Sequence, residues 1–272
     1  MELLLVHLTD IHIQEEKDFD ILLSRSEAIS RAIMLHITKA ENTIVFLCVT
    51  GDITYSGTKE QFDYGALFIG EIVETIRKRY GKVIVQIVVI PGNHDCDFED
   101  SFAPTRDLLL KNIDMSAVVF PQIMESYTKI QRGYFEYASS LGREGIGFGC
   151  QEDKILTENV YNDCENGVTI RFHCINSAWC SSKHEVKGKM HFTVNDDYEK
   201  KENDIVVTLM HHDESWLDWD DAENWKNYYK KYADIVFVGH DHVAEYVYKE
   251  NYNAASNYFI KGNQLYSSGN SE

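Results

Sequence analysis

The sequence predicts an α/β fold that begins with parallel strands. Three short apolar runs, 3–8, 43–50 and 83–90, have the length and composition of buried strands, and the last two are rich in β-branched residues. The two segments between them, 19–40 and 59–80, carry apolar residues at helical spacing. This β-α-β-α-β order implies parallel strands joined by right-handed crossovers. The strands also end in polar residues, at the sheet edge where α/β proteins place their sites.

The polar strand ends recur five times along the chain. The motifs that follow the predicted strands are Asp10-Ile11-His12, Thr50-Gly51-Asp52, Gly92-Asn93-His94-Asp95, His211-His212-Asp213 and Gly239-His240-Asp241-His242. Any one of them is typical of a turn or a cap. Five together predict a single polar cluster that distant segments assemble.

The region after the third strand differs in composition. It contains Pro104, Pro121 and the glycine-rich stretch 142–149, and its helical spacing predicts a helix over 121–141. We interpret 96–165 as an insertion that folds over the strand ends, either as a substrate-selecting lid or as a packing cover. Further strands are predicted at 168–175, 205–210, 234–239, 243–249 and 256–261, with a helix at 221–232.

A length of 272 residues allows one large domain or two small ones, and we interpret residues 1–272 as a single domain. The chain ends directly after a strand-like run, which suggests the N-terminal part of a longer protein with a fused or associated effector domain. No apolar run approaches the roughly 20 residues of a membrane span, and no secretory leader is evident. We therefore expect a cytoplasmic protein without a membrane partner, whose six cysteines stay reduced.

The chain is strongly acidic, with 26 Lys and Arg against 44 Asp and Glu and a net charge of -18. Such a surface repels nucleic acid non-specifically, because affinity there comes from cations at phosphates. It does not exclude a nucleic-acid substrate, since two bound divalent cations would reverse the local field.

The residue types at the strand ends are those of a metal site. Asp, His and Asn without thiolates suit divalent manganese, iron, zinc, nickel or cobalt. Two metals about 3.5–4 Å apart need a bridging carboxylate, a role that Asp52 can fill between its neighbours. Asp10 and His12 can hold one metal, and Asn93 the other. The histidines that supply the remaining ligands are His211, His240 and His242.

These five motif blocks, in this order from residue 10 to residue 242, resemble those of the calcineurin-like metallophosphoesterase superfamily. The resemblance implies a four-layer α-β-β-α sandwich of two mixed sheets flanked by helices, with a dinuclear site at its edge. It assigns Asp10, His12, Asp52 and His242 to metal 1, and Asp52, Asn93, His211 and His240 to metal 2. It also implies that His94 is catalytic; whether His211 or His212 is the ligand is decided only by alignment to the motif.

The implied chemistry is phosphoester hydrolysis by a hydroxide that bridges two metals, manganese first among them, with His94 as general acid. The stretch Gly51–Phe62 lacks the Asp-Arg-Gly of protein phosphatases and resembles cyclic-nucleotide phosphodiesterases and repair nucleases of the superfamily. We therefore expect a phosphodiester of a nucleotide or nucleic acid as substrate. A phosphomonoester substrate, and a non-catalytic metal-binding sensor or regulatory module, remain as alternatives.

Asp95 and the four tryptophans each have two interpretations. Asp95 can orient His94 or cap the turn that follows. The tryptophans that can stack on a nucleobase, or pack in the core or a lid, are Trp179, Trp216, Trp219 and Trp225.

Overall fold

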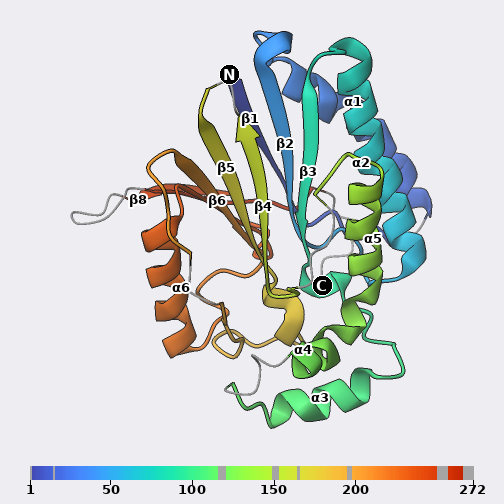
Figure 1. The fold of residues 1–272 in the computed structure, drawn as a ribbon. Helices are drawn as coiled ribbons and strands as arrows, with labels where there is room; N and C mark the ends of the chain where they lie inside the picture. The colour runs from blue at the N-terminus through green and yellow to red at the C-terminus, as the bar shows by residue number, and fades with distance from the viewer. Residues whose placement is uncertain are drawn as a thin grey trace.

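The computed structural model consists of two β-sheets packed against each other, with helices on both outer sides (Figure 1). It describes residues 2–14, 16–115, 121–148, 153–163, 166–194, 198–249 and 257–265. The predicted α/β class, with two sheets flanked by helices, is confirmed.

The smaller sheet is formed by the first three predicted strands. Its strands are β1 (Glu2–Leu8), β2 (Thr43–Thr50) and β3 (Ile84–Ile90), in the order β1-β2-β3 and all parallel. The helices on its outer side are α1 (Glu16–Met34), α2 (Lys59–Arg79) and α5 (Arg132–Arg143). The crossovers through α1 and α2 are those that the alternating sequence pattern predicts.

The larger sheet is mixed and has the order β4-β5-β6-β7-β9-β8. Its strands are β4 (Leu156–Asp163), β5 (Val168–Ile175), β6 (Asp204–Met210), β7 (Ile235–Val238), β8 (Glu245–Lys249) and β9 (Asn257–Lys261). The strands from β5 to β9 in this order are parallel, whereas β4 and β8 pair antiparallel at the two edges. Helix α6 (Trp219–Tyr232) covers the outer face, where Trp225 is fully buried.

The space between the sheets is filled by apolar side chains from both. The buried residues of this inner layer include Phe46, Cys48, Val88, Phe172, Leu209 and Phe237. Because both faces of β2 are covered, all eight of its residues are buried. This explains why its sequence is a nearly continuous apolar run rather than an alternating one.

The region 96–165 contains both helices and a strand. The helix expected at 121–141 is two helices, α4 (Pro121–Thr128) and α5, separated by a 3-10 turn at Lys129–Gln131. Helix α3 (Ala103–Lys111) begins around Pro104, which fits the first turn because its missing amide is not needed there. The end of the region, β4, belongs to the larger sheet rather than to a cover over the strand ends.

Candidate metal centre

All the residues that the sequence singles out for metal binding and catalysis lie at one end of the two sheets. The strand register aligns Thr50 with Ile90 in the smaller sheet and Met210 with Val238 in the larger one. The carboxyl ends of these strands therefore meet at one edge, at the lower end of the sheets in Figure 1. The loops that follow them carry the seven candidate ligands and His94.

A first group of side chains comes from the loops after β1, β2 and β7. His12 Nε2 lies 3.2 Å from His242 Nε2 and 3.7 Å from Asp10 Oδ1. His242 Nε2 is 3.2 Å from the same Asp10 oxygen. Asp52 Oδ2 lies 3.8 Å from His12 Nε2. These are the four residues expected at metal 1.

A second group adjoins the first through Asp52. Asn93 Oδ1 lies 3.1 Å from His211 Nε2 and 3.0 Å from His240 Nδ1, and the two nitrogens are 3.2 Å apart. Asp52 Oδ2 is 3.4 Å from His211 Nε2. One oxygen of Asp52 thus borders both groups, as the expected bridging position requires.

The backbone of this cluster is unusual. Among the described residues, the non-glycine residues with positive φ are Asp10, His12, Asp52, His240 and His242, with φ between 53° and 70°. All five are candidate ligands. Left-handed backbone costs of order 1–3 kcal/mol for such a residue and persists where surrounding structure enforces it, typically at functional sites. Conformational strain in the described chain is therefore concentrated on this cluster.

Glycines let the loops approach one another closely. A Cβ atom on Gly92 would stand 2.1 Å from Asp52 Oδ1, and one on Gly239 would stand 2.2 Å from Thr9 Oγ1. Gly51 has a φ of 90° and also touches Gly92. The glycines of these motifs are explained by lack of space for a side chain.

Comparison with known families decides the identity of this arrangement. The family model for calcineurin-like phosphoesterases matches residues 3–244, most of the chain. The chain belongs to the calcineurin-like phosphoesterase family.

Solved structures similar to this calcineurin-like phosphoesterase include two hydrolases at low identity. One is a phosphopantetheinyl hydrolase from Mycobacterium tuberculosis, 13% identical over 97% of this chain and 90% of that chain, with a TM-score of 0.44. Another is a dimetal phosphatase from Danio rerio, 11% identical over 95% and 87% of the two chains, with a TM-score of 0.42. Comparison with curated proteins finds no match.

The family implies two divalent metal ions, and the cluster fits them. Ligands bound at about 2.1 Å to one ion lie roughly 3.0–3.4 Å from each other, close to the separations in both groups. Among the described residues, Asp10 Oδ1 is buried without a hydrogen-bond partner of good geometry, although His242 Nε2 lies 3.2 Å away, and a cation would satisfy it. Nitrogen and oxygen donors of this kind suit borderline and hard divalent ions.

Electrostatics inside the cluster favour ionised carboxylates, neutral imidazoles at His12 and His240, and a protonated imidazole at His211. Burial raises the pKa of Asp52, but the charge of His211 outweighs this and holds it well below its usual value. Burial lowers the pKa of His12 to about 4, and it lowers that of His240 as well. Burial acts likewise on His211, but Asp52 outweighs it and raises the His211 pKa to about 10. A divalent cation would compete with that proton, because the ligand must be neutral imidazole.

His94 stands beside the cluster without being one of its bridging donors. Its backbone amide donates to Asp52 Oδ1 at 2.8 Å, which places its side chain over the first group. Its ring lies 4.7 Å from the His12 ring, centroid to centroid. Its Nδ1 lies 2.8 Å from the Tyr55 carbonyl oxygen, to which it donates. A ring nitrogen of His94 also lies within 4.8 Å of the ligand atoms of His12 and Asp52, so the imidazole is at the edge of the first group.

Asp95 serves the turn rather than His94. Its carboxylate accepts hydrogen bonds from the backbone amides of Gly92 at 3.0 Å and Thr54 at 2.9 Å. Burial, with the nearby charge of Asp52, raises its pKa to about 6. Of the two interpretations of Asp95, the structure supports the cap.

His211 and His212 point in different directions. His211 Nδ1 donates to the Thr50 carbonyl oxygen at 2.6 Å, which directs its Nε2 to Asp52 and the other ligands. His212 instead contacts Ser177 Oγ at 2.8 Å and Glu185 Oε2 at 3.3 Å. His212 nevertheless shares with His211 and His240 a group of ligand atoms that all lie within 4.8 Å of one another, so the motif-based choice of His211 stays a prediction.

The tryptophans divide between core and surface. Trp179 and Trp225 are buried, Trp219 is exposed, and Trp216 packs edge-on to His240 at 4.2 Å. Of the four, only Trp216 directly contacts a candidate ligand, so it alone retains the interpretation of a residue at the site.

Two charged residues near the cluster were not anticipated. Glu185 contacts His212 and lies 3.7 Å from His240. Lys261, on β9, pairs with Asp213 and lies 3.7 Å from Asp241, so it links the two loops that carry the histidines. A single charged residue in a loop or edge strand gives no periodic signal by which sequence analysis could have found either.

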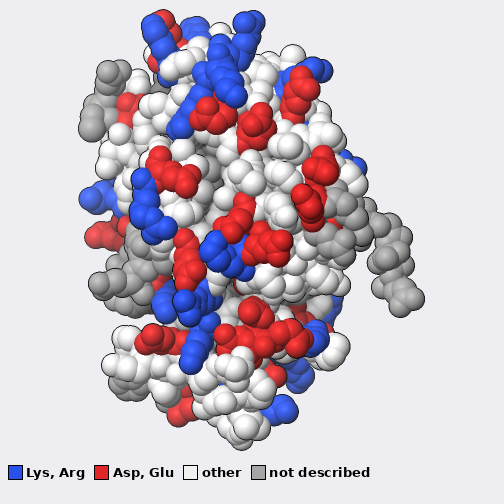
Figure 2. Space-filling view, turned by 90° about the vertical axis from the view of Figure 1, so that its right-hand side faces the viewer, with Lys and Arg blue, Asp and Glu red and all other residues white. Residues whose placement is uncertain are grey.

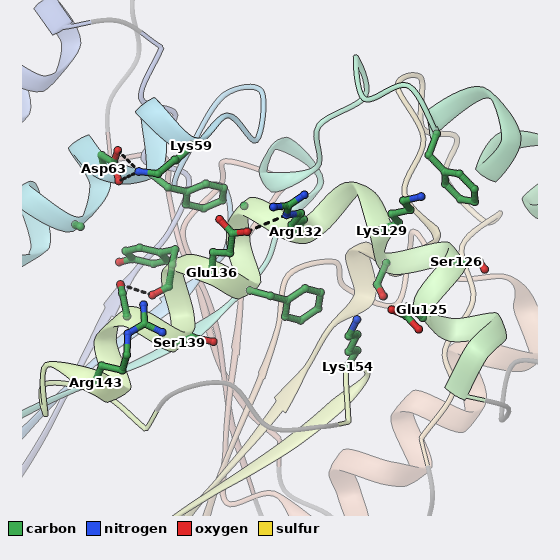
Figure 3. Close-up of a pocket in the computed structure, with 18 of the residues that line it drawn as sticks. Lys59, Asp63, Glu125, Ser126, Lys129, Arg132, Glu136, Ser139, Arg143 and Lys154 are labelled. Atoms are coloured by element: carbon green, nitrogen blue, oxygen red, sulfur yellow. Dashed lines mark hydrogen bonds and ion pairs between the residues drawn. The ribbon is translucent and has the colours of Figure 1, made fainter.

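A separate groove of about 870 Å³ lies between α2, α4 and α5 (Figure 3). None of the candidate ligands lines it. Its charges are partly neutralised, because Lys59 pairs with Asp63 and Arg132 with Glu136. The candidate metal centre is therefore identified by the convergence of its Asp, Asn and His side chains, because the groove of about 870 Å³ lies elsewhere.

Proposed function

We propose that this calcineurin-like phosphoesterase is an active dinuclear enzyme that hydrolyses a phosphodiester of a nucleotide or nucleic acid, with His94 as general acid. The observation that carries the proposal is the convergence of the seven candidate ligands in two adjoining groups that share Asp52, with the His94 ring beside them. A scaffold that only bound metal would not need a histidine in that position.

The ligand set prepares a position for the phosphate. Two divalent cations bound there would supply Lewis acidity and a water of lowered pKa. The residues of the chain hold the donor atoms in place: Asp52 lies between both groups, and the Thr50 carbonyl fixes the tautomer of His211. Cations held by these ligands would stabilise the negative charge that develops on the phosphate oxygens.

His94 can deliver a proton to the leaving oxygen. Because Nδ1 donates to a backbone carbonyl, the imidazole can gain and lose its second proton at Nε2. General acids of this kind contribute typically 10²–10⁴-fold. Their contribution is largest when the leaving group is strongly basic, such as the alkoxide of a nucleoside.

One observation favours a phosphodiester of a nucleotide over a phosphoprotein, and a second favours a nucleotide over a long nucleic-acid duplex. The segment after Gly51-Asp52 lacks the basic residue of the protein phosphatases and places Tyr55, 47% exposed, beside His94. The face with α2 and α5 shows Lys and Arg interspersed with Asp and Glu, not gathered into a basic stripe (Figure 2). The net charge of -18 favours a nucleotide or a short single strand over a long duplex, because a nuclease groove usually carries a basic stripe.

The decisive experiment combines a substrate panel with His94→Ala. Mn²⁺-loaded protein is assayed on bis-p-nitrophenyl phosphate, p-nitrophenyl phosphate, cyclic nucleotides, a dinucleotide and single- and double-stranded DNA and RNA. His94→Ala should keep both metals, lose roughly 10²–10⁴-fold on the alkyl phosphodiester, and lose much less on the nitrophenyl ester. The exposed His36→Ala, at the end of α1, is the control.

Each other outcome points elsewhere. Equal losses by His94→Ala on both kinds of ester would remove the general-acid role. Turnover of p-nitrophenyl phosphate alone would assign a phosphomonoester substrate. Metal-loaded protein that hydrolyses nothing in the panel would replace the enzyme by a metal-binding regulatory module.

A further inference from the structure

A buried carboxylate lies behind the second group of ligands. Glu185 is on the loop between the 3-10 turn Ser177–Cys180 and β6, and its side chain is only 7% exposed. Its Oε1 is buried without a hydrogen-bond partner among the described residues. Burial of an ionised carboxylate is costly unless it is paired and hydrogen-bonded, so its position needs a reason.

The other oxygen of Glu185 faces two histidines. Oε2 lies 3.3 Å from His212 Nε2 and 3.7 Å from His240 Nε2. The two imidazole rings pack at 4.3 Å, centroid to centroid. On its far side, His212 Nδ1 is 2.8 Å from Ser177 Oγ, so a continuous polar chain runs from Ser177 through His212 to Glu185.

His240 uses its two nitrogens in opposite directions. Its Nδ1 lies 3.0 Å from Asn93 Oδ1 and 3.2 Å from His211 Nε2, inside the candidate centre. Its Nε2 is directed to Glu185. A neutral imidazole that offers a lone pair at Nδ1 carries its proton at Nε2, and that proton needs an acceptor in a buried place.

The two histidines of this group thus have different acceptors behind them. His211 donates to a neutral carbonyl, that of Thr50, at 2.6 Å. His240 Nε2 has a carboxylate oxygen of Glu185 3.7 Å away, just beyond hydrogen-bond distance. A carboxylate that closes to hydrogen-bond distance on a metal-binding imidazole fixes its tautomer and raises its basicity.

We propose that Glu185 is a positioning residue of the metal centre, whose carboxylate accepts the Nε2 proton of His240 and holds its Nδ1 toward the second metal position. The proposal rests on the dinuclear centre put forward above. It makes His212 a bridge that anchors Glu185 through Ser177, and not a ligand.

The loop that carries Glu185 is held in place from one side. The amides of Gly188 and Lys189 donate to the carbonyls of Ser215 and Trp216, both at 3.1 Å. Removal of the Glu185 carboxylate should therefore change the environment of His240 without releasing the loop.

The test measures binding of Mn²⁺ alone, by calorimetry and electron paramagnetic resonance, in three variants. Glu185→Ala removes the acceptor. Glu185→Gln keeps an acceptor oxygen without the charge. Glu202→Gln, on an exposed loop before β6, changes the net charge by the same amount away from the centre.

Glu185→Ala should weaken one of the two Mn²⁺ sites by about 10–100-fold, the usual effect of removing a partner behind a ligand. The other site should keep its affinity, so the spectrum of the coupled metal pair should give way to that of isolated Mn²⁺. Glu185→Gln should recover part of the affinity, and Glu202→Gln should match wild type.

The inference is overturned if Glu185→Ala binds both ions with wild-type affinity, or if Glu202→Gln weakens binding equally. If Glu185→Ala does not fold, Glu185→Gln decides alone, and wild-type affinities in a folded Glu185→Gln would sink it. A wild-type protein that binds no Mn²⁺ would instead refute the dinuclear centre itself, so the two failures are distinguishable.

Discussion

Gly92→Ala tests whether the position of the Asp52 carboxylate controls the centre. The new Cβ would stand 2.1 Å from Asp52 Oδ1 and 2.6 Å from its amide nitrogen. The carboxylate must move by about 1 Å to restore even a 3.0 Å contact. The φ of Gly92 is -106°, which alanine adopts freely, so the contact and not the backbone conformation causes the effect.

The expected consequences follow from that displacement. A misplacement of about 1 Å costs of order 10²-fold in rate, and overpacking costs about 1–3 kcal/mol in the free energy of unfolding. Because Asp52 borders both groups, Gly92→Ala should also reduce binding at both Mn²⁺ sites. Measurements are metal content, phosphodiesterase rate with saturating Mn²⁺, and thermal unfolding.

Gly70→Ala is the matched control for this substitution. Gly70 lies within α2 and has no atom within 4 Å of the Cβ position. Alanine there should leave metal binding and rate unchanged and stabilise the helix by about 0.5–1 kcal/mol. Wild-type metal content and rate in folded Gly92→Ala would refute the reasoning, because the shared carboxylate would then tolerate displacement.

Two further predictions concern stability away from the ligands. Burial lowers the pKa of His173 to about 4, so below pH 6.5 the unfolded chain binds a proton that the native state does not. The free energy of unfolding should therefore fall by up to about 3 kcal/mol between pH 6.5 and pH 4. Chemical denaturation of His173→Asn should show a flatter dependence on pH. An unchanged slope would mean that His173 is protonated in the fold. Lys261→Met leaves the buried Asp213 carboxylate, 4% exposed, without its cation. The free energy of unfolding should fall by about 3 kcal/mol, which lowers the thermal midpoint by roughly 6–12 °C. A fall of less than about 1 kcal/mol would show that the ion pair is solvated.

The fold around β1 to β3 could be predicted because its signals are local. Buried parallel strands appear as continuous apolar runs, and the helices between them as periodic stripes, so each element is visible in its own segment. The candidate ligands could be predicted for the same reason, since each motif directly follows a strand. Their convergence required only that parallel strands share a carboxyl edge.

Other features have no local signal. β4 has a polar sequence with two asparagines and is recognisable as a strand only from its pairing with β5, so the sequence alone predicts it as part of an insertion. The break at Lys129–Gln131 interrupts a segment whose periodicity continues on both sides.

The sequence by itself determined which residues are available for chemistry and at which strand ends they lie, because strand ends are marked by neighbours in the chain. Only the tertiary structure decided that His211 Nε2 lies 3.4 Å from Asp52, that His212 contacts Ser177, and that Glu185 stands behind His240. Those relations join residues far apart in the chain, and they depend on how loops pack and on which nitrogen of each imidazole finds an acceptor.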